Sequence, residues 1–371
     1  MPVPLLDLPA QYASIRDAVM PAVLAVIERQ QFIMGPEIAE LESAIATLSR
    51  VSHAIGCASG TDALLLPLMA LDLQPGDEVI TPAFTFFATA GTVHNTGGTP
   101  VFVDIERASF NLAPDAVEAA ITPRTRAIIA VHLYGQMAAM ERLLALGAKH
   151  GIPVIEDAAQ SIGARRQMEG AWRLAGETGW VGTLSFFPTK NLGAWGDGGM
   201  ILTQDATLAE RLRRLRTHGG AKQYHHDEVG TNSRLDTLQA ALLLAKLPFL
   251  AGWSAARRKN AEGYSARFRG HSAVVPPAVD PANEHIFHQY TIRAPRRDEL
   301  REHLKAHGIG SAVYYPLPLH LQPCFAHLGY RRGSLPETEA AMGEVLSLPV
   351  YPELTEAQQE RVIQTISAFY G

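Results

Sequence analysis

The stretch His53–Pro82, HAIGCASGTDALLLPLMALDLQPGDEVITP, contains the unit from which the type of fold follows. A short apolar run, HAIGC, precedes apolar residues at helical spacing from Asp62 to Leu71. The turn residues PGD then lead into a second apolar run, EVITP. A strand, a helix and a second strand in this order form the repeating unit of a parallel sheet covered by helices. The stretch therefore predicts an α/β fold.

The same alternation continues on both sides of this stretch. Upstream, helical spacing over Tyr12 to Glu28 and Glu37 to Leu48 predicts an N-terminal arm and helix. Downstream, helical stretches alternate with the apolar runs PVFVD, AIIAVHLYG, PVIED, LSFF and GMILT; the stretches are Phe87 to Asn95, Pro114 to Ala120, Met140 to His150 and Ala206 to Leu215. We therefore expect a mostly parallel sheet with helices on both faces.

The last third of the chain has a different pattern. A long helical region from Leu235 to about Arg269 ends in a proline-bearing break, HSAVVPPAVDP. Beyond it we expect a strand (QYTIRA), a helix from Arg297 to His307, a strand (SAVYY) and a helix over roughly the last seventeen residues. We predict two domains, an N-terminal arm with a large domain over 1–250, and a linking helix with a small C-terminal α/β domain over 251–371.

Composition narrows the function classes. The chain has 371 residues, 47% of them hydrophobic, and a net charge of -5 with scattered Lys and Arg, which argues against nucleic acid as a partner. Its two cysteines, Cys57 and Cys324, lie far apart, which favours a reducing compartment over a disulfide or zinc framework. The N-terminus has no signal-peptide pattern, and no run approaches the roughly 18 apolar residues of a membrane span. We predict a cytoplasmic protein with no membrane partner.

Lys190 is the first candidate for chemistry. It stands in TLSFFPTKNLGAWGDGG, Thr183–Gly199, in a glycine-rich turn directly after an apolar run. An amine that condenses with an aldehyde needs a rigid stem and open backbone around it, and this segment supplies both. Most lysines are solvated surface charges, so the assignment depends on the other candidates.

Ser59, Gly60, Thr61 and Asp62 stand between the HAIGC strand and a helix. Free backbone N–H groups and the Thr61 hydroxyl would converge there, as in a phosphate site at a helix N-terminus. A simple N-cap uses the same residue types. In an open sheet, however, ligands gather where strands end, which favours the phosphate interpretation.

Asp157 follows the run PVIE, with Gln160 three residues later. A carboxylate at that point can keep a pyridinium nitrogen protonated, which makes a pyridoxal ring an electron sink. The alternative is an Asp that caps the next turn. Three aromatic side chains follow another strand and offer a face for ring stacking, although such residues are more often core: Phe84, Phe86 and Phe87.

Together these motifs resemble the fold-type I enzymes that use pyridoxal 5'-phosphate (PLP), and more narrowly the DegT/DnrJ/EryC1/StrS family of nucleotide-sugar aminotransferases. The resemblance covers nearly the whole chain, through GPE near residue 36, SGTDAL, PGDEVITPAFTFFAT, VHLYG, PVIEDAAQSIGA, SFFPTKNLG, GDGGM, GTNSRLDTLQAA, YYPLPLHLQP and LSLPVYP. It implies a large domain with a mostly parallel seven-stranded sheet.

The resemblance also implies roles for single residues. Lys190 would bind the cofactor aldehyde covalently and later move a proton between cofactor and substrate carbons. Asp157 would pair with the pyridine nitrogen, Gln160 would lie near the ring hydroxyl and Phe86 would cover the ring. The phosphate would be held by Gly60, Thr61, Ser185 and, from the other subunit of a homodimer, Asn232.

The segment HGGAKQYHHDEVGTNSRLDTLQAA most resembles relatives that aminate C3 of a UDP-linked 3-keto-N-acetylglucosamine-type uronic acid. Arg234 suits a sugar carboxylate, because a planar guanidinium pairs with it through two hydrogen bonds. Tyr314 stands where some of those enzymes have His. Tyr315 and His320 are expected near the nucleotide sugar. The adjacent His225 and His226 are read as surface residues or substrate contacts, so we assign no metal.

The sequence thus predicts an aminotransferase that moves an amino group from L-glutamate to a nucleotide-linked keto sugar, with pyridoxamine phosphate and 2-oxoglutarate formed in between, for a surface polysaccharide such as an O-antigen. Alternatives within the class are a dTDP-3-keto-6-deoxyhexose 3-aminotransferase and a sugar 4-aminotransferase. From another class comes a PLP-binding regulator without turnover. Sugar dehydratases of this family have histidine in place of the lysine, so Lys190 argues against that chemistry.

Overall fold

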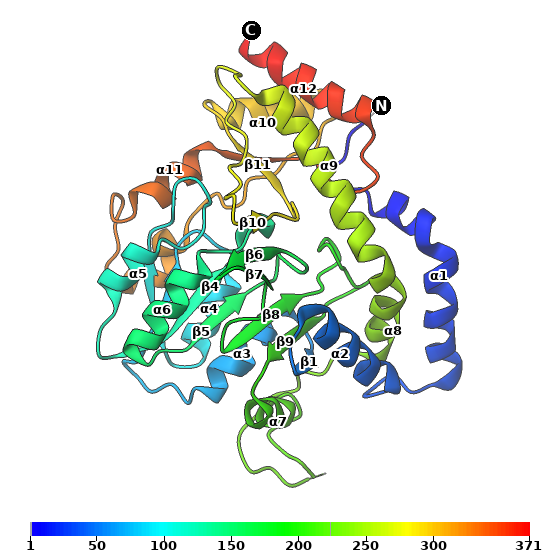
Figure 1. Cartoon of the computed structure of the whole chain (residues 1–371), viewed down its shortest axis with the longest axis vertical. Coiled ribbons are helices and arrows are strands. Elements are labelled where there is room, and N and C mark those ends of the chain that lie inside the picture. Colours follow the sequence, from blue (N-terminus) through cyan, green and yellow to red (C-terminus); the bar gives the residue numbers. More distant parts are fainter. Residues whose placement is uncertain (1, 223) are drawn as a thin grey trace.

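A sheet of seven strands forms the central layer of the fold, as the alternation and the resemblance predict (Figure 1). The computed structural model describes residues 2–222 and 224–371. The sheet order is β1-β9-β8-β5-β4-β2-β3, and β9 alone runs antiparallel to its neighbours. The strands are β1 (His53–Cys57), β2 (Glu78–Pro82), β3 (Thr99–Val103), β4 (Thr125–Val131), β5 (Val154–Asp157), β8 (Val181–Ser185) and β9 (Gly199–Thr203).

Helices cover both faces of this sheet. One hydrophobic core joins the sheet to α2 (Pro36–Ser49), α5 (Pro114–Ala120), α6 (Met140–His150) and α8 (Thr237–Lys246). A second core joins the opposite face to α3 (Gly60–Ala70), α4 (Ala88–Asn95), α7 (Ala206–Leu215) and α11 (Pro336–Glu344). The central strands are apolar on both faces because both faces are covered.

A third core forms the C-terminal part of the molecule. It brings Val3 together with buried residues between Ala261 and Ile366. Its elements are α9 (Leu250–Phe268), α10 (Arg297–Ala306), α12 (Glu356–Tyr370) and the antiparallel pair β11 (Tyr290–Arg293) and β12 (Val345–Leu348). A separate small sheet pairs β6 (Arg165–Met168) with β7 (Ala171–Leu174) and β10 (Asn283–Glu284). A domain boundary near residue 250 stays a prediction, and α9 begins at that residue.

The segment SAVYY does not form the predicted strand. Its one ladder contact is an isolated bridge between Ala312 and Ser347. The hydroxyl of Tyr134 donates to the Tyr314 carbonyl, and prolines follow at positions 316 and 318. Since proline has no N–H to donate, a ladder cannot continue through this segment.

The predicted long helix after Leu235 is a run of three elements, α8, the 3-10 turn Leu247–Phe249 and α9. Among the described residues, this run from Thr237 to Phe268 is the one helix long and apolar enough to cross a membrane by length and composition. The expectation that no run comes close to that limit is therefore wrong. The run is nonetheless a packed element, since 44% of its most apolar window is buried and α8 lies against α1 (Leu8–Arg29) and α2.

Candidate active site

The predicted site residues follow strands whose carboxyl ends share one edge of the central sheet. Strands β2, β4, β5 and β8 are parallel, and β1 points the same way because β9 is antiparallel to both β1 and β8. Asp157 ends β5, Ser185 ends β8, and Lys190 and Gly60 follow β8 and β1. Ligands of open α/β sheets bind at this edge.

Asp157 is a buried carboxyl group with no cation in hydrogen-bond contact among the described residues. Its Oδ2 accepts from the Thr89 hydroxyl at 3.0 Å, and its Oδ1 accepts from the Ala159 N–H at 3.3 Å. Burial raises the pKa of Asp157, although these two bonds and the nearby charge of Lys190 act in the opposite direction. A positive ligand group beside this carboxylate would relieve that cost.

Lys190 stands in the turn after β8, where its backbone N–H donates to the Phe187 carbonyl at 2.8 Å. Burial lowers the pKa of Lys190 to about 8, and the charge of Asp157 opposes this shift. The amine is therefore a free base in a much larger fraction of molecules near neutral pH than an ordinary lysine is. A free amine is the form that attacks an aldehyde.

The start of α3 and the end of β8 lie close together, and we call Gly60, Thr61 and Ser185 the α3 cradle. Ser59 caps the helix, since its hydroxyl accepts from the Asp62 N–H at 3.1 Å. Among the described residues, no hydrogen bond uses the backbone N–H groups of Gly60 and Thr61. A Cβ atom on Gly60 would lie 2.6 Å from the Ser185 Cβ, so only glycine leaves room there. The N-cap and the phosphate interpretations are thus compatible, because they use different donors.

Gln160 and the aromatic residues lie around the same edge. Gln160 Oε1 accepts from the Tyr134 N–H at 2.7 Å, and its Nε2 donates to the Tyr315 hydroxyl at 3.2 Å. The rings of Tyr315 and Phe86 are 6.4 Å apart, and Phe86 is 59% exposed. Phe84 is buried in the core, whereas the Phe87 ring stacks on Phe325. Phe86 is therefore the one of the three phenylalanines whose ring stays open beside Tyr315.

Two other predicted residues, Asn232 and Arg234, form no hydrogen bond with Lys190 or Asp157 among the described residues. Asn232 is exposed and bridges to Thr217, and its neighbour Ser233 donates to Asp62 at 2.7 Å. Arg234 lines a different cavity, formed with residues between 217 and 230, and its Nε is buried without a partner.

The two remaining substrate candidates differ in exposure. Tyr314 is partly exposed and lines a small cavity with Thr189, next to Lys190. The side chain of His320, in contrast, has no exposed surface, and its Nε2 lies 3.2 Å from Glu339 Oε1. The structure does not bring His320 to an open face beside Lys190.

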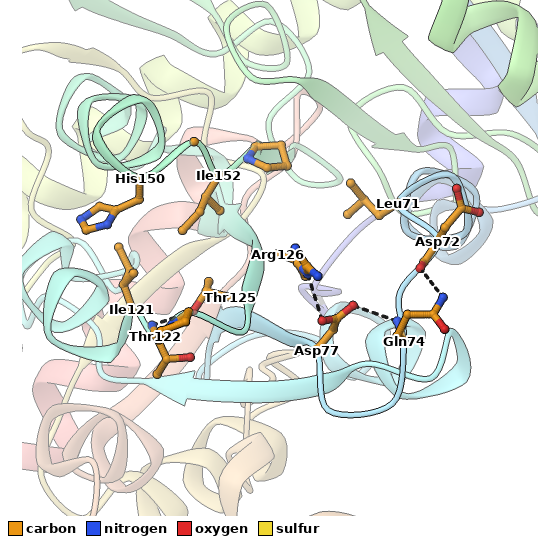
Figure 2. A pocket seen from close by; sticks show the side chains of 13 residues that line it. Leu71, Asp72, Gln74, Asp77, Ile121, Thr122, Thr125, Arg126, His150 and Ile152 are labelled. Atoms are coloured by element: carbon orange, nitrogen blue, oxygen red, sulfur yellow. Dashed lines mark hydrogen bonds and ion pairs between the residues drawn. The ribbon is translucent and has the colours of Figure 1, made fainter.

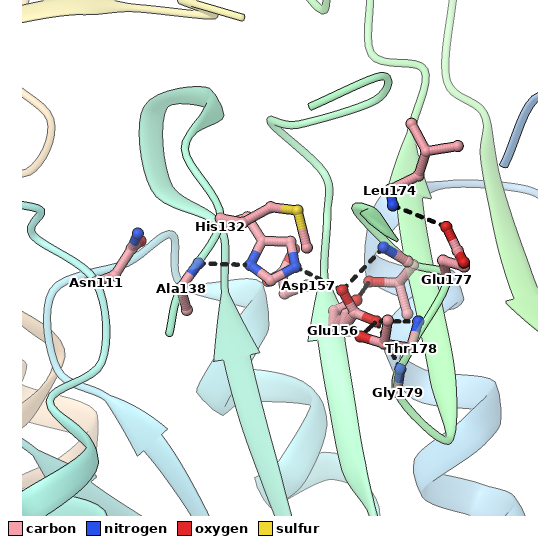
Figure 3. A network of polar contacts seen from close by, with 12 residues as sticks. Asn111, His132, Ala138, Glu156, Asp157, Leu174, Glu177, Thr178 and Gly179 are labelled. Carbon is pink, nitrogen blue, oxygen red and sulfur yellow. Dashed lines mark hydrogen bonds and ion pairs between the residues drawn. The ribbon is translucent and has the colours of Figure 1, made fainter. Parts of the chain in front are cut away.

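Sequence reasoning missed a buried polar network directly beneath Asp157 (Figure 3). Glu156 accepts from the N–H groups of Gly176, Thr178 and Gly179 and lies 2.7 Å from His132 Nε2. The Ala138 N–H donates to His132 Nδ1, so the ring carries its proton on Nε2. Burial alone would raise the pKa of Glu156, but the His132 bond and the backbone donors lower it. The network holds the end of β5 in place.

Thr89 and His288 were also missed. Thr89 lies inside α4 and reaches Asp157 from there. His288 is buried, with Nδ1 3.0 Å from Asn191 Oδ1, and burial together with the charge of Lys190 holds its pKa well below the usual range. A threonine in a helix and a histidine almost one hundred residues beyond the lysine carry no local signal of such contacts.

A cavity of about 780 Å³ lies at the opposite, amino edge of the sheet (Figure 2). It is lined by residues around the starts of β2, β4 and β5. Its charged groups are already paired, for example Arg126 with Asp77 at 2.9 Å. The side chains drawn in Figure 2 offer no nucleophile and no unpaired buried charge, so cavity size alone does not mark the reactive edge.

The carboxyl edge fits PLP in its chemistry. Asp157 presents a buried carboxylate without a cation, Lys190 presents an amine of lowered pKa, and the α3 cradle presents unpartnered N–H groups beside a serine hydroxyl. A pyridinium nitrogen, an aldehyde and a phosphate are the three complementary ligand groups.

A family model described as the DegT/DnrJ/EryC1/StrS aminotransferase family matches residues 13–367. The chain belongs to this family. A pleiotropic regulatory protein of Geobacillus stearothermophilus is 52% identical over 373 residues, which span 100% of this chain and 99% of the relative. The UDP-N-acetyl-3-dehydro-alpha-D-glucosamine 3-aminotransferase of Acidithiobacillus ferrooxidans is 48% identical over 98% of this chain and 97% of the relative. The UDP-2-acetamido-2-deoxy-3-oxo-D-glucuronate aminotransferase of Pseudomonas aeruginosa is 45% identical over 95% of this chain and 96% of the relative.

Solved structures agree with the family membership. The crystal structure of S. venezuelae DesV in complex with a ketimine intermediate has a TM-score of 0.96 and 43% identity, covering 99% of this chain and 98% of that one. NtdA from Bacillus subtilis with bound cofactor PMP has a TM-score of 0.88 and 31% identity, covering 98% and 82%. The predictions of family, fold, enzyme class and cofactor are confirmed: this member of the DegT/DnrJ/EryC1/StrS family is a PLP-dependent sugar aminotransferase.

Proposed function

We propose that the enzyme transfers an amino group from L-glutamate to C3 of a UDP-linked 3-keto sugar, and most narrowly to UDP-2-acetamido-2-deoxy-3-keto-glucuronic acid. The observation that carries the reaction class is the presence at the carboxyl edge of two titratable groups within electrostatic reach of each other, the half-buried Lys190 and the buried Asp157. The C3 position and the UDP group are supported by the names of two relatives, which are 48% and 45% identical.

Bound PLP supplies an aldehyde that condenses with amines and a ring that withdraws electrons. The chain supplies the rest. Lys190, with a pKa of about 8, takes up and returns a proton without a large free-energy cost at either step. Asp157 keeps the ring nitrogen protonated, and its burial strengthens that pairing. Phe86 covers the ring, and the Gly60, Thr61 and Ser185 cradle anchors the phosphate.

We propose further that two copies share each site, and that Asn232 and Arg234 act on the partner's substrate and cofactor. Among the described residues neither forms a hydrogen bond with Lys190 or Asp157 of its own chain, Asn232 is exposed, and the buried Arg234 Nε has no partner. An unpartnered guanidinium suits the carboxylate of a uronic acid. Cytoplasmic location and a role in surface polysaccharide synthesis, such as that of an O-antigen, stay predictions.

Transfer of labelled nitrogen tests the function. The purified enzyme would be given L-glutamate with labelled amino nitrogen and, in separate reactions, UDP-3-keto-N-acetylglucosamine, its uronic acid and a dTDP-linked 3-keto-6-deoxyhexose. We expect the label in the UDP-uronic acid at the highest rate, by mass spectrometry and NMR of the product. An Arg234→Gln variant is expected to lose its preference for the uronic acid over the neutral UDP sugar. Label in the dTDP sugar alone would overturn the substrate proposal.

A second candidate function, a PLP-binding regulator without turnover, is favoured by one observation: the 52% identical relative is named a pleiotropic regulatory protein. The arrangement of Lys190 and Asp157 supports turnover, because a regulator needs the cofactor only as a ligand. A protein that binds PLP but converts none of it to pyridoxamine phosphate with any amino acid would support the regulator.

A further inference from the structure

Arg257, on α9, is a buried cation without a counter-ion in hydrogen-bond contact. Its side chain is almost fully buried, and its Nη1 donates to the carbonyl of Val350 at 2.8 Å and to those of Phe287 and His288 at 3.3 Å. Its Nε is buried with no partner, and among the described residues no hydrogen bond uses Nη2. Burial lowers the pKa of Arg257 to about 10, against the attraction of Glu353. A buried guanidinium with unpaired N–H groups lowers the stability of the fold unless a ligand accepts hydrogen bonds from those groups.

The guanidinium lines a small cavity that adjoins the lysine turn. Thr189, which precedes Lys190, lines the same cavity, together with His288, Gln289 and Tyr314. The charges of Lys190 and Arg257 both lower the pKa of the buried His288, after burial itself, so both cations lie within electrostatic reach of that ring. Gln289 Oε1 is a second buried polar atom without a partner. Two unsatisfied polar groups on one cavity indicate a polar ligand.

The size of the cavity restricts that ligand. Its volume is about 70 Å³. Roughly 10–15 Å³ of such space holds one water molecule, so the cavity has room for a small polar group. A planar group with two acceptor oxygens matches the fork of an arginine.

We propose that Arg257 binds a carboxylate group of the amino donor in this cavity, beside the lysine that receives the amine. This inference rests on the proposed function, because it assigns a place to the amino acid in the same site. The donor is the reactant whose carboxylate lies close to its reacting nitrogen. Arg257 thereby distinguishes amino acids from amines that have no carboxylate.

Glu353 is the carboxylate of the chain that competes with such a ligand. Its Oε2 is buried without a partner, and burial raises its pKa while the charge of Arg257 lowers it. It does not reach ion-pair distance of the guanidinium among the ion pairs of the described residues. Removal of its charge should therefore leave Arg257 freer to bind an added anion.

Binding of glutarate to the PLP-loaded enzyme, measured by titration calorimetry, tests the site. Glutarate has the carboxylates of the donor but no amine, so its binding requires neither turnover nor the sugar, and a failed sugar assay leaves the result unaffected. We expect glutarate to bind and its neutral diamide not to bind. Arg257→Lys should raise the Kd of glutarate at least tenfold, Arg257→Met should abolish binding, and Glu353→Gln should lower the Kd or leave it unchanged.

Arg297 offers the matched control. It is also a buried arginine of the C-terminal part, and its Nη1 and Nη2 donate to the carbonyls of Val345 and Met342. Arg297→Met should bind glutarate as the wild type does. Thermal unfolding and the cofactor spectrum report whether each variant is folded, and if Arg257→Met fails to fold, Arg257→Lys and Glu353→Gln decide. Unchanged glutarate binding in Arg257→Lys, or weaker binding in Glu353→Gln, would overturn the proposal.

Discussion

The two edges of the central sheet differ in whether their charged side chains form ion pairs. At the amino edge, Asp77 pairs with Arg126 and Glu78 pairs with Arg124, next to the cavity of about 780 Å³. At the carboxyl edge, the buried Asp157 and the half-buried Lys190 form no ion pair with each other, and the pKa shift of each favours its uncharged form. Ion pairs are typical of structural sites, whereas unpaired titratable groups with shifted pKa values are typical of active sites. The difference locates the active site better than cavity size does.

The largest loss of activity is expected from substitution of Lys190 at the carboxyl edge. Lys190→Ala removes both the amine that binds the aldehyde and the group that moves the proton, so we expect amino transfer to fall by about 10⁴-fold or more. Steady-state transfer from L-glutamate measures the loss. A variant that keeps a tenth of the wild-type rate would place the chemistry elsewhere.

Asp157→Asn should cost less activity and should change stability in the opposite direction. We expect transfer to fall on the order of 10²–10³-fold, because the ring nitrogen loses its anionic partner. The folded pKa of Asp157 is raised, so its ionisation costs stability as the pH rises above the unfolded value of about 3.9. The cofactor-free variant should therefore unfold at a higher temperature than the cofactor-free wild type at pH 7, and the gap should close toward pH 4. A less stable variant at pH 7 would contradict the unpaired state of this carboxylate.

Gly60→Ala should weaken cofactor binding without removing chemistry. Its Cβ would lie 2.6 Å from the Ser185 Cβ, and an overpacking cost of about 1–3 kcal/mol corresponds to a rise of roughly 5- to 160-fold in the Kd of PLP. Equilibrium dialysis measures the Kd. Gly252→Ala, where a Cβ meets no atom within 4 Å, is the control and should bind PLP normally. Equal Kd values of PLP for Gly60→Ala and Gly252→Ala would argue against phosphate binding by the α3 cradle.

The smallest effect is expected at the amino edge. The Arg126 side chain is 57% exposed, and its pair with Asp77 is worth at most about 1 kcal/mol of unfolding free energy. Arg126→Ala should keep amino transfer within about twofold of wild type, since the pair is far from the reactive edge in the sheet topology. A large loss of transfer would show that the cavity in Figure 2 takes part in the reaction.

The sequence predicts the part of the site that follows from strand order. Asp157, Lys190 and Gly60 each come at or shortly after the end of an apolar run. Parallel pairing brings the ends of β5 and β8 to one edge, and the antiparallel β9 between β8 and β1 brings the end of β1 to the same edge. The roles assigned to single residues stay predictions.

What the sequence does not predict comes from longer-range packing. Thr89 reaches Asp157 from inside a helix, and Arg257 enters its cavity from a helix of the C-terminal part. The strand expected over SAVYY fails because Tyr134, far away in the chain, takes up the Tyr314 carbonyl. His320 stands in the motif YYPLPLHLQP, and its expected place near the nucleotide sugar stays a prediction; its contact with Glu339 comes from packing that no local pattern reports.

The most direct measurement is the near-visible absorbance spectrum of the purified protein before and after L-glutamate, for wild type and for Lys190→Ala. The wild type should show the band of lysine-bound PLP, and glutamate should convert it to the shorter-wavelength band of pyridoxamine phosphate. Lys190→Ala should lack the lysine-bound band at every PLP concentration. A wild type without that band after added PLP, or a variant that still shows it, would contradict Lys190 and Asp157 as the centre of the active site.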